Sequence, residues 1–132
     1  MAESGLAKKL KLTGKKRAAV LGAPAGYFAS LRAAAAEKLD GKFDWIQMFV
    51  RSQAELDRGI DEVVEALEPE SILWISFPKR SSKIQTDLTR DKGWDPLERH
   101  ELKWITLVSV DETWSAFGVR PSREGEARQD WR

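Results

Sequence analysis

Cysteine is absent from the 132-residue sequence, and His100 is its single histidine. The lack of cysteine excludes disulfides, thiolate nucleophiles and thiolate metal sites, and one histidine excludes a zinc site built on two or more histidines. No apolar run approaches the roughly 20 residues that a membrane helix needs. Charged residues (Glu3, Lys8 and Lys9) stand where a signal peptide has its apolar core, which predicts a cytoplasmic protein that does not enter a membrane.

The sequence also lacks an excess of charge of one sign, because its 22 Lys and Arg residues are nearly balanced by 21 Asp and Glu residues, for a net charge of +1. This balance gives no argument for a nucleic-acid partner. Hydrophobic residues make up 42% and charged residues 33%, as in soluble globular proteins. We expect one domain over residues 1–120, followed by a loose tail over residues 121–132, where no periodicity is seen.

The stretch Ser71–Arg90 (SILWISFPKRSSKIQTDLTR) organises the rest of the chain. Ile72–Phe77 is apolar apart from Ser76, which indicates a central strand buried on both faces. Pro78 cannot donate to a sheet ladder and must end this strand. A cationic, hydroxyl-rich loop follows, as in open α/β sheets, whose loops at the carboxyl ends of the strands face ligands.

The other predicted elements alternate between helices and strands. The sequence Ser52-Gln53-Ala54-Glu55 fits a capping box at the start of a helix that Glu68-Pro69 ends. Thr86 or Asp87 is expected to cap a short helical turn, and Asp95-Pro96 supplies the N-cap and first position of another. Further helices are predicted at Gly5–Leu12 and Tyr27–Leu39, and further strands at Ala18–Gly22, Phe43–Val50, Lys103–Val110 and Thr113–Val119.

This alternation predicts a Rossmann-like α/β fold, with a mainly parallel five-stranded sheet of order 1-2-3-5-4, whose last strand is antiparallel and closes a C-terminal β-hairpin. Because every crossover then advances in one direction, we expect all the connecting helices on one face. The strands FDWIQMFV, SILWISF and KWITLVSV place bulky apolar side chains on both faces, including Trp45, Trp74 and Trp104, and a single short helix is left to cover the opposite face. Either the tail or a second copy must cover the rest, and we expect a homodimer.

The segment Glu65–Pro121 resembles the second half of class I S-adenosylmethionine-dependent methyltransferases. ALEPESILWISFPK stands where these enzymes have the strand after their fourth helix, and VDETWSAFGVRP is similar to their terminal β-hairpin. Nearly the whole chain also resembles a family of small uncharacterised bacterial proteins, through its GAP-like turn and the motifs FPKRSS, TDLTRD and VDETWSA. These resemblances imply a truncated methyltransferase-like fold.

The first half departs from the methyltransferase pattern. Those enzymes have a G-x-G-x-G turn after the first strand and an acidic residue at the end of the next, whereas this chain has Gly22-Ala23-Pro24-Ala25-Gly26. A proline in the turn removes a backbone donor. The sequence also shows no counterpart of two of their strands and of the acidic residue, and without these strands the topological switch point where such cofactors bind is expected to be missing. We therefore predict no bound cofactor and, in particular, no binding of S-adenosylmethionine.

Several polar groups are expected to meet at the carboxyl edge of the sheet. Their cations and hydroxyls suit a phosphate or carboxylate, although such a loop is equally explained as solvated surface. The predicted anion site consists of Lys79, Arg80, Ser81, Ser82 and Lys83, with Arg51, Gly22 and Gly26 from neighbouring turns.

Other candidate residues favour structural roles. His100 ends a short helix, where a cation suits the helix dipole, and no catalytic residue is identified. Asp87 and Asp91 have a spacing that suits a metal, but Arg90 between them favours an exposed, charge-balanced turn, so no metal is predicted. The basic segment Lys8–Arg17 is either a phosphate-binding patch or a solvated helix and turn. Core packing explains the six tryptophans better than base stacking.

Three functions stay open at this point. The absent glycine turn and the lack of a catalytic constellation favour a methyltransferase-like module without methyltransferase activity, which binds a ligand or a partner. The alternatives are an enzyme or binding protein that uses the Lys79–Lys83 loop against an anionic ligand, and a nucleic-acid-associated protein that uses its basic N-terminus.

Overall fold

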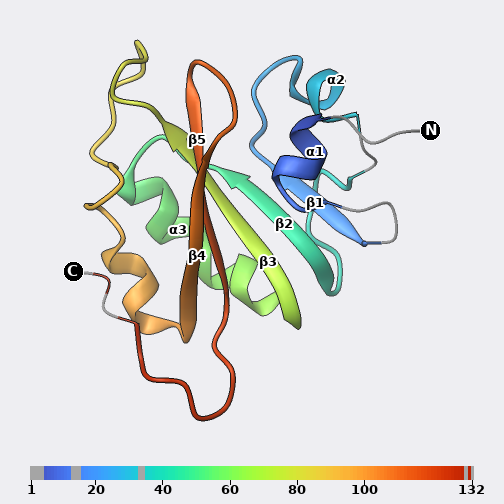
Figure 1. The fold of residues 1–132 in the computed structure, drawn as a ribbon, viewed down its shortest axis with the longest axis vertical. Coiled ribbons are helices and arrows are strands. Elements are labelled where there is room, and N and C mark those ends of the chain that lie inside the picture. The colour runs from blue at the N-terminus through green and yellow to red at the C-terminus, as the bar shows by residue number, and fades with distance from the viewer. Residues whose placement is uncertain (1–4, 13–15, 33–34, 130, 132) are drawn as a thin grey trace.

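A five-stranded sheet of order β1-β2-β3-β5-β4 forms the centre of the structure (Figure 1). The computed structural model describes residues 5–12, 16–32, 35–129 and 131. The first three strands are parallel, and β5 is antiparallel to both β3 and β4. The predicted fold class and strand order are thereby confirmed. The strands are β1 (Ala18–Leu21), β2 (Phe43–Phe49), β3 (Leu67–Pro78), β4 (Leu102–Ser109) and β5 (Trp114–Pro121).

In the described part of the chain, the sheet is accompanied by the helices α1 (Gly5–Lys9), α2 (Tyr27–Leu31) and α3 (Gln53–Glu65) and by the 3-10 helix η1 (Asp95–Arg99). The start of α3 agrees with the sequence, because the Ser52 hydroxyl accepts a hydrogen bond from Glu55 N at 3.2 Å. The Glu55 carboxylate accepts a hydrogen bond from the backbone N–H of Arg51. In a capping box the donor is the backbone N–H of the N-cap residue, here Ser52, which is one residue later. None of the described helices is long and apolar enough to cross a membrane.

The helix predicted over Tyr27–Leu39 is too long. It ends after Leu31, because Arg32 adopts the left-handed conformation with φ of 54°. Ala36 then lies beside β1 as a parallel bridge: its N–H donates to Ala18 O, and its carbonyl accepts from Val20 N, both at 2.8 Å. The high helix propensity of this alanine-rich segment is therefore overridden by sheet pairing.

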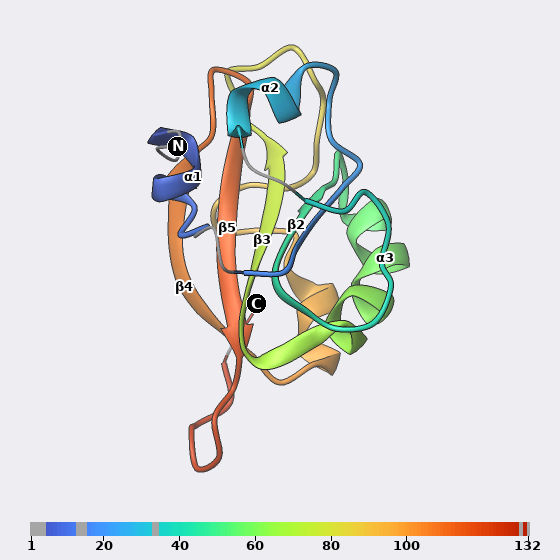
Figure 2. The same ribbon diagram turned by 90° about the vertical axis from the view of Figure 1, so that its right-hand side faces the viewer.

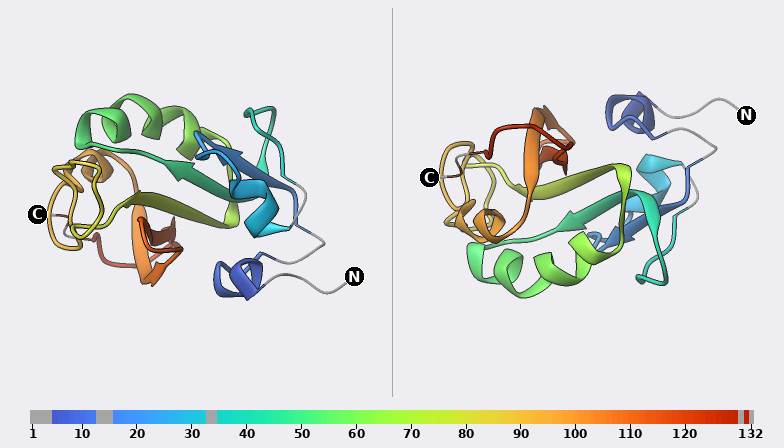
Figure 3. Two further views of the ribbon diagram at one scale, coloured as in Figure 1. Left: turned by 90° about the horizontal axis from the view of Figure 1, so that it is seen from above. Right: turned by 90° about the horizontal axis from the view of Figure 1, so that it is seen from below.

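The connecting helices lie on opposite faces of the sheet, contrary to the prediction that they share one face (Figure 3). Residues of α2 pack with Val20 and Trp45, whereas residues of α3 pack with Ala19 and Ile46. The reason is the Ala36 bridge, which takes the chain outward beyond β1 before it returns to β2. This reversal creates a topological switch point between β1 and β2, which the sequence analysis expected to be missing.

The face expected to stay bare is largely covered by α1 and α2 (Figure 2). Trp45 and Trp74 are completely buried there, and both indole N–H groups donate to the carbonyl oxygen of Leu10, at 2.8 and 2.7 Å. Trp104, by contrast, is 43% exposed. Trp45 and Trp74 are therefore covered by the chain itself.

Residues 122–129 form no helix or strand, but the chain end packs against the domain. Trp131 is 7% exposed, and its backbone N–H donates to the Glu98 carboxylate at 2.7 Å. Arg120 and Glu126 form an ion pair at 2.8 Å. Hydrogen bonds from Arg120 and from the Arg123 backbone lower the pKa of Glu126 to about 2, so this pair stays ionised over the physiological pH range.

Candidate functional site

The loop between β3 and η1, residues 79–94, is shaped by hydrogen bonds from its own hydroxyl side chains. Thr86 Oγ1 accepts from Leu88 N at 3.1 Å, and Thr89 Oγ1 accepts from Lys92 N at 3.1 Å. Such local bonds give the backbone an alternative to helix, and no helical turn forms at Thr86 or Asp87. These oxygens act as acceptors, which leaves their O–H groups available as donors.

Three contacts anchor this loop to the domain. Leu88 and Trp94 are buried in the core cluster on the α3 face. The Asp87 carboxylate accepts a hydrogen bond from Gln53 N, the first residue of α3, at 2.8 Å. Lys79 N donates to Thr113 O at 2.7 Å. The loop is therefore a folded part of the sheet's carboxyl edge, which lies at the top of Figure 1.

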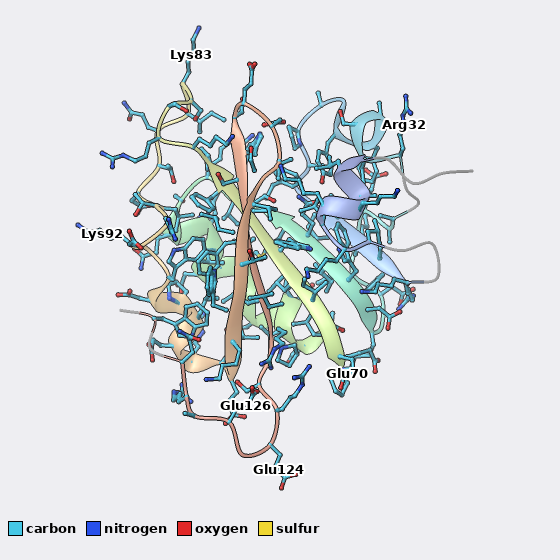
Figure 4. All side chains as sticks on the ribbon, in the orientation of Figure 1. Arg32, Glu70, Lys83, Lys92, Glu124 and Glu126 are labelled. Carbon is cyan, nitrogen blue, oxygen red and sulfur yellow. The ribbon has the colours of Figure 1, made fainter. Side chains whose placement is uncertain are left out.

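A hollow of about 690 Å³, which we call the cationic pocket, lies within this loop. Lys83 and Lys92 extend from it into solvent (Figure 4). Three cationic residues and one acidic residue line the pocket, so its charge favours an anion. Its charged and hydroxyl side chains are those of Arg80, Lys83, Asp91, Lys92, Ser82, Thr86 and Thr89.

The structure brings together only part of the anion site that the sequence predicts. Arg80, Ser82 and Lys83 line the cationic pocket, but Ser81 does not. Lys79 Nζ instead donates to Ser109 Oγ of β4 at 2.6 Å.

Three further residues of the predicted anion site lie elsewhere on the carboxyl edge of the sheet. The Arg51 guanidinium stands 5.8 Å from the ring centre of Trp114. Gly22 lines a separate groove, and Gly26, with φ of 82°, precedes α2. Lys92, Thr86 and Thr89 were not predicted as site residues, because the loop brings them to the same hollow as Lys83 only through the burial of Leu88 and Trp94.

The groove beside Gly22 has a volume of about 510 Å³ and runs between β1 and α3 at the switch point. Its charged side chains are Glu37, Lys38, Glu55 and Glu62. Glu37 directly follows the Ala36 bridge, so an acidic side chain does lie near the turn after β1. Glu37 was not predicted as a site residue, because the expected helix over Tyr27–Leu39 includes it.

The remaining titratable candidates serve packing between elements. His100 Nε2 lies 2.6 Å from Asp61 Oδ1, and Arg99 pairs with Asp57 and Asp61, which joins η1 to α3. Hydrogen bonds from Arg99, and secondly from His100, lower the pKa of Asp61. Among the described residues, no group of three His, Asp or Glu side chains is arranged to hold a metal ion.

The basic N-terminal segment is partly engaged by the fold. Arg17 donates to the carbonyl oxygens of Asp40 and Lys42, and its guanidinium lies 4.1 Å from the ring centre of Phe43. Lys16 Nζ donates to Lys11 O at 3.3 Å, and Lys15 lies outside the described residues.

The fold is similar to those of several methyltransferases of known structure. Mitomycin 7-O-methyltransferase MmcR aligns with a TM-score of 0.59 over 83% of this chain and 50% of its own, at 9% identity. The M1A22 tRNA methyltransferase TrmK of B. subtilis gives 0.56 over 92% and 67%, at 11% identity. The ribosomal protein L11 methylase of Lactobacillus delbrueckii subsp. bulgaricus gives 0.52 over 89% and 64%, at 18% identity.

These likenesses concern the fold. No family model matches the sequence, and no curated protein matches it significantly. The chain spans half the length of MmcR and 64% of the L11 methylase. It therefore has the Rossmann-like fold of class I S-adenosylmethionine-dependent methyltransferases in a shortened form, which confirms the resemblance seen in the sequence.

Proposed function

We propose that this shortened methyltransferase-like domain acts as a binding module for a small anion and does not transfer methyl groups. The observation that carries the proposal is the cationic pocket, where Arg80, Lys83 and Lys92 line the same hollow as hydroxyl side chains of an anchored loop. Loops at the carboxyl edge of a parallel sheet are the usual place for ligands in α/β folds. Phosphate and carboxylate groups match these donors.

The residues at the switch point do not fit S-adenosylmethionine. Pro24 has no backbone N–H, and its carbonyl oxygen already accepts from Tyr27 N at 3.1 Å. On the α2 side, the Phe49 ring lies between those of Tyr27 and Trp114, at centroid distances of 4.8 and 5.1 Å. Side chains therefore fill that side of the crevice. On the other side, Glu37 supplies one carboxylate and Lys38 one ammonium group.

The expected result of titrating the protein with S-adenosylmethionine in a calorimeter is no binding at micromolar concentration. The physical reason is the missing donor at Pro24 and the filled crevice around Phe49. A micromolar dissociation constant, competed by S-adenosylhomocysteine and weakened by Glu37→Gln, would contradict the proposal.

Inorganic phosphate is expected to bind in the cationic pocket, and the double variant Lys83→Gln/Lys92→Gln is expected to lose at least about tenfold in affinity. Each charge-assisted hydrogen bond contributes about 1.5–3 kcal/mol when it is well formed. The measurement is a phosphate titration followed by amide NMR shifts, at constant ionic strength so that general screening does not change.

The matched control is Lys8→Gln/Lys9→Gln, which removes the same charge from the exposed side of α1. This control is expected to bind phosphate as the wild type does. Equal weakening in both double variants, or phosphate-induced shifts that avoid residues 80–92, would show that the pocket is not the site.

A homodimer remains a prediction. Along β4, the outer strand of the sheet, Ile105 and Val108 are only partly buried, and its outer edge has no partner strand among the described residues. Pairing of two such edges across a two-fold axis would cover them. Light scattering is expected to give a mass near twice 14.9 kDa, and a mass of 14.9 kDa would refute the dimer.

A further inference from the structure

A second hollow, the aromatic pocket, opens beside β4 and β5 on the α3 face, with a volume of about 310 Å³. Phe117 is at its centre. Trp94 stacks on this ring at a centroid distance of 3.9 Å, and Trp131 and Trp104 lie at 5.9 and 6.4 Å. Trp104 is the only large hydrophobic side chain exposed in the described part of the chain.

A β-bulge aims Trp104 at this pocket. In the register of β4 and β5, Leu107 is opposite Phe117 and Trp104 is opposite Val119, with a shift between Trp104 and Thr106. The extra residue, Ile105, packs with the cluster on the other face. Strict alternation from Leu107 would place Trp104 on that other face, away from Phe117. Bulges of this kind re-aim side chains next to functional sites.

The polar lining of the aromatic pocket shows which ligand fits. Besides the rings, it contains the guanidinium of Arg90, the carboxylate of Asp91 and the amide of Gln129. An organic cation also stacks on aromatic rings, and the pocket offers it both an attracting carboxylate, Asp91, and a repelling guanidinium, Arg90. A flat heteroaromatic ring with both donors and acceptors on its edge matches the rings and all three polar groups.

The aromatic pocket adjoins the cationic pocket, because Asp91 lines both. The turn that separates them places Arg90 on the aromatic side, and Thr89 and Lys92 on the cationic side. Figures 1 and 3 show this loop and the end of the described chain on the same side of β4. A ligand that spans the turn meets aromatic rings at one end and cations at the other.

We propose that the two pockets together bind a nucleotide, with its base against Trp104 and its phosphate in the cationic pocket. This inference rests on the proposed function, because the phosphate is the anion proposed there. A free mononucleotide and an unpaired nucleotide of single-stranded RNA share this chemistry. Both use base–aromatic stacking beside a cationic surface.

The test compares AMP, GMP, CMP and UMP with ribose 5-phosphate by calorimetry. At least one mononucleotide is expected to bind about tenfold more tightly than ribose 5-phosphate, which lacks the base. Trp104→Leu is expected to abolish this difference and to leave ribose 5-phosphate binding unchanged. Trp104→Phe, which keeps an aromatic ring, is expected to retain part of the difference.

NMR of the wild-type protein gives a second readout that does not depend on a variant's stability. The indole N–H signal absent from Trp104→Phe identifies Trp104, and the mononucleotide, but not ribose 5-phosphate, is expected to move it. A short oligoadenylate that binds more tightly than AMP identifies RNA as the source, and equal affinity identifies the free nucleotide; both outcomes support the site.

Two results would overturn the nucleotide inference. The first is that no mononucleotide binds more tightly than ribose 5-phosphate and the Trp104 indole signal does not move. If phosphate still binds and still requires Lys83 and Lys92, the proposed anion-binding function survives that result. The second is that choline, an organic cation without a base, binds through Trp104 more tightly than any mononucleotide.

Discussion

Replacement of Gly118 by alanine is expected to lower the free energy of unfolding by about 1–3 kcal/mol, the usual cost of overpacking a core. Gly118 of β5 pairs with Trp74 of β3, and a Cβ atom added there would lie 2.7 Å from the Trp74 ring. The ring has no room to yield, because Trp74 is completely buried and its indole N–H is bonded to Leu10 O.

Urea unfolding followed by circular dichroism measures this change. Gly5→Ala is the matched control, since an added Cβ there meets nothing within 4 Å and α1 gains helix propensity. In the double variant Trp74→Leu/Gly118→Ala, the smaller side chain should accommodate the methyl group, so the two costs are expected to be less than additive. Strict additivity, or an unchanged midpoint for Gly118→Ala, would contradict the close packing of Gly118 on Trp74.

The strands were predictable because their signals are local. Ile72–Phe77 is an apolar run that Pro78 ends, and the pattern of Phe43–Val50 is as clear, so the core of both strands is found where expected. The true start of β3 at Leu67 was missed. Glu68 and Pro69 are typical of a helix end or a turn, and only pairing with β2 makes that segment extended.

The path between β1 and β2 was not predictable from local patterns. Tyr27–Leu39 is rich in alanine and predicts a helix, but pairing of Ala36 with Ala19 is a tertiary effect that propensity does not contain. This single bridge changes the faces on which the helices lie. It also restores the switch point and brings Glu37 next to Gly22.

The same contrast between local signals and tertiary effects applies to the candidate site residues. Arg80 and Lys83 were predicted because they follow a strand directly in sequence, at the edge where α/β folds usually bind ligands. Trp104 was assigned to the core because alternation along a strand does not reveal a bulge. Burial of Trp45, Trp74, Trp94, Trp114 and Trp131 confirms core packing for the other tryptophans.

The second large effect is expected directly after α1, where Leu10→Ala should lower the free energy of unfolding by about 2–5 kcal/mol. Leu10 is completely buried, and its carbonyl oxygen accepts the indole N–H groups of both Trp45 and Trp74. The truncation leaves a cavity beside these two rings. It thereby weakens the docking of α1, on which both hydrogen bonds depend.

Lys8→Ala, on the exposed side of α1, is the control for Leu10→Ala and is expected to change stability by less than about 0.5 kcal/mol. Urea unfolding measures both variants, and binding of a hydrophobic dye reports exposure of the Trp45 and Trp74 face. If Leu10→Ala binds the dye and also associates, α1 acts as the built-in cover of a face that otherwise needs a partner. Equal stability of the two variants would mean that the docking of α1 contributes little to the fold.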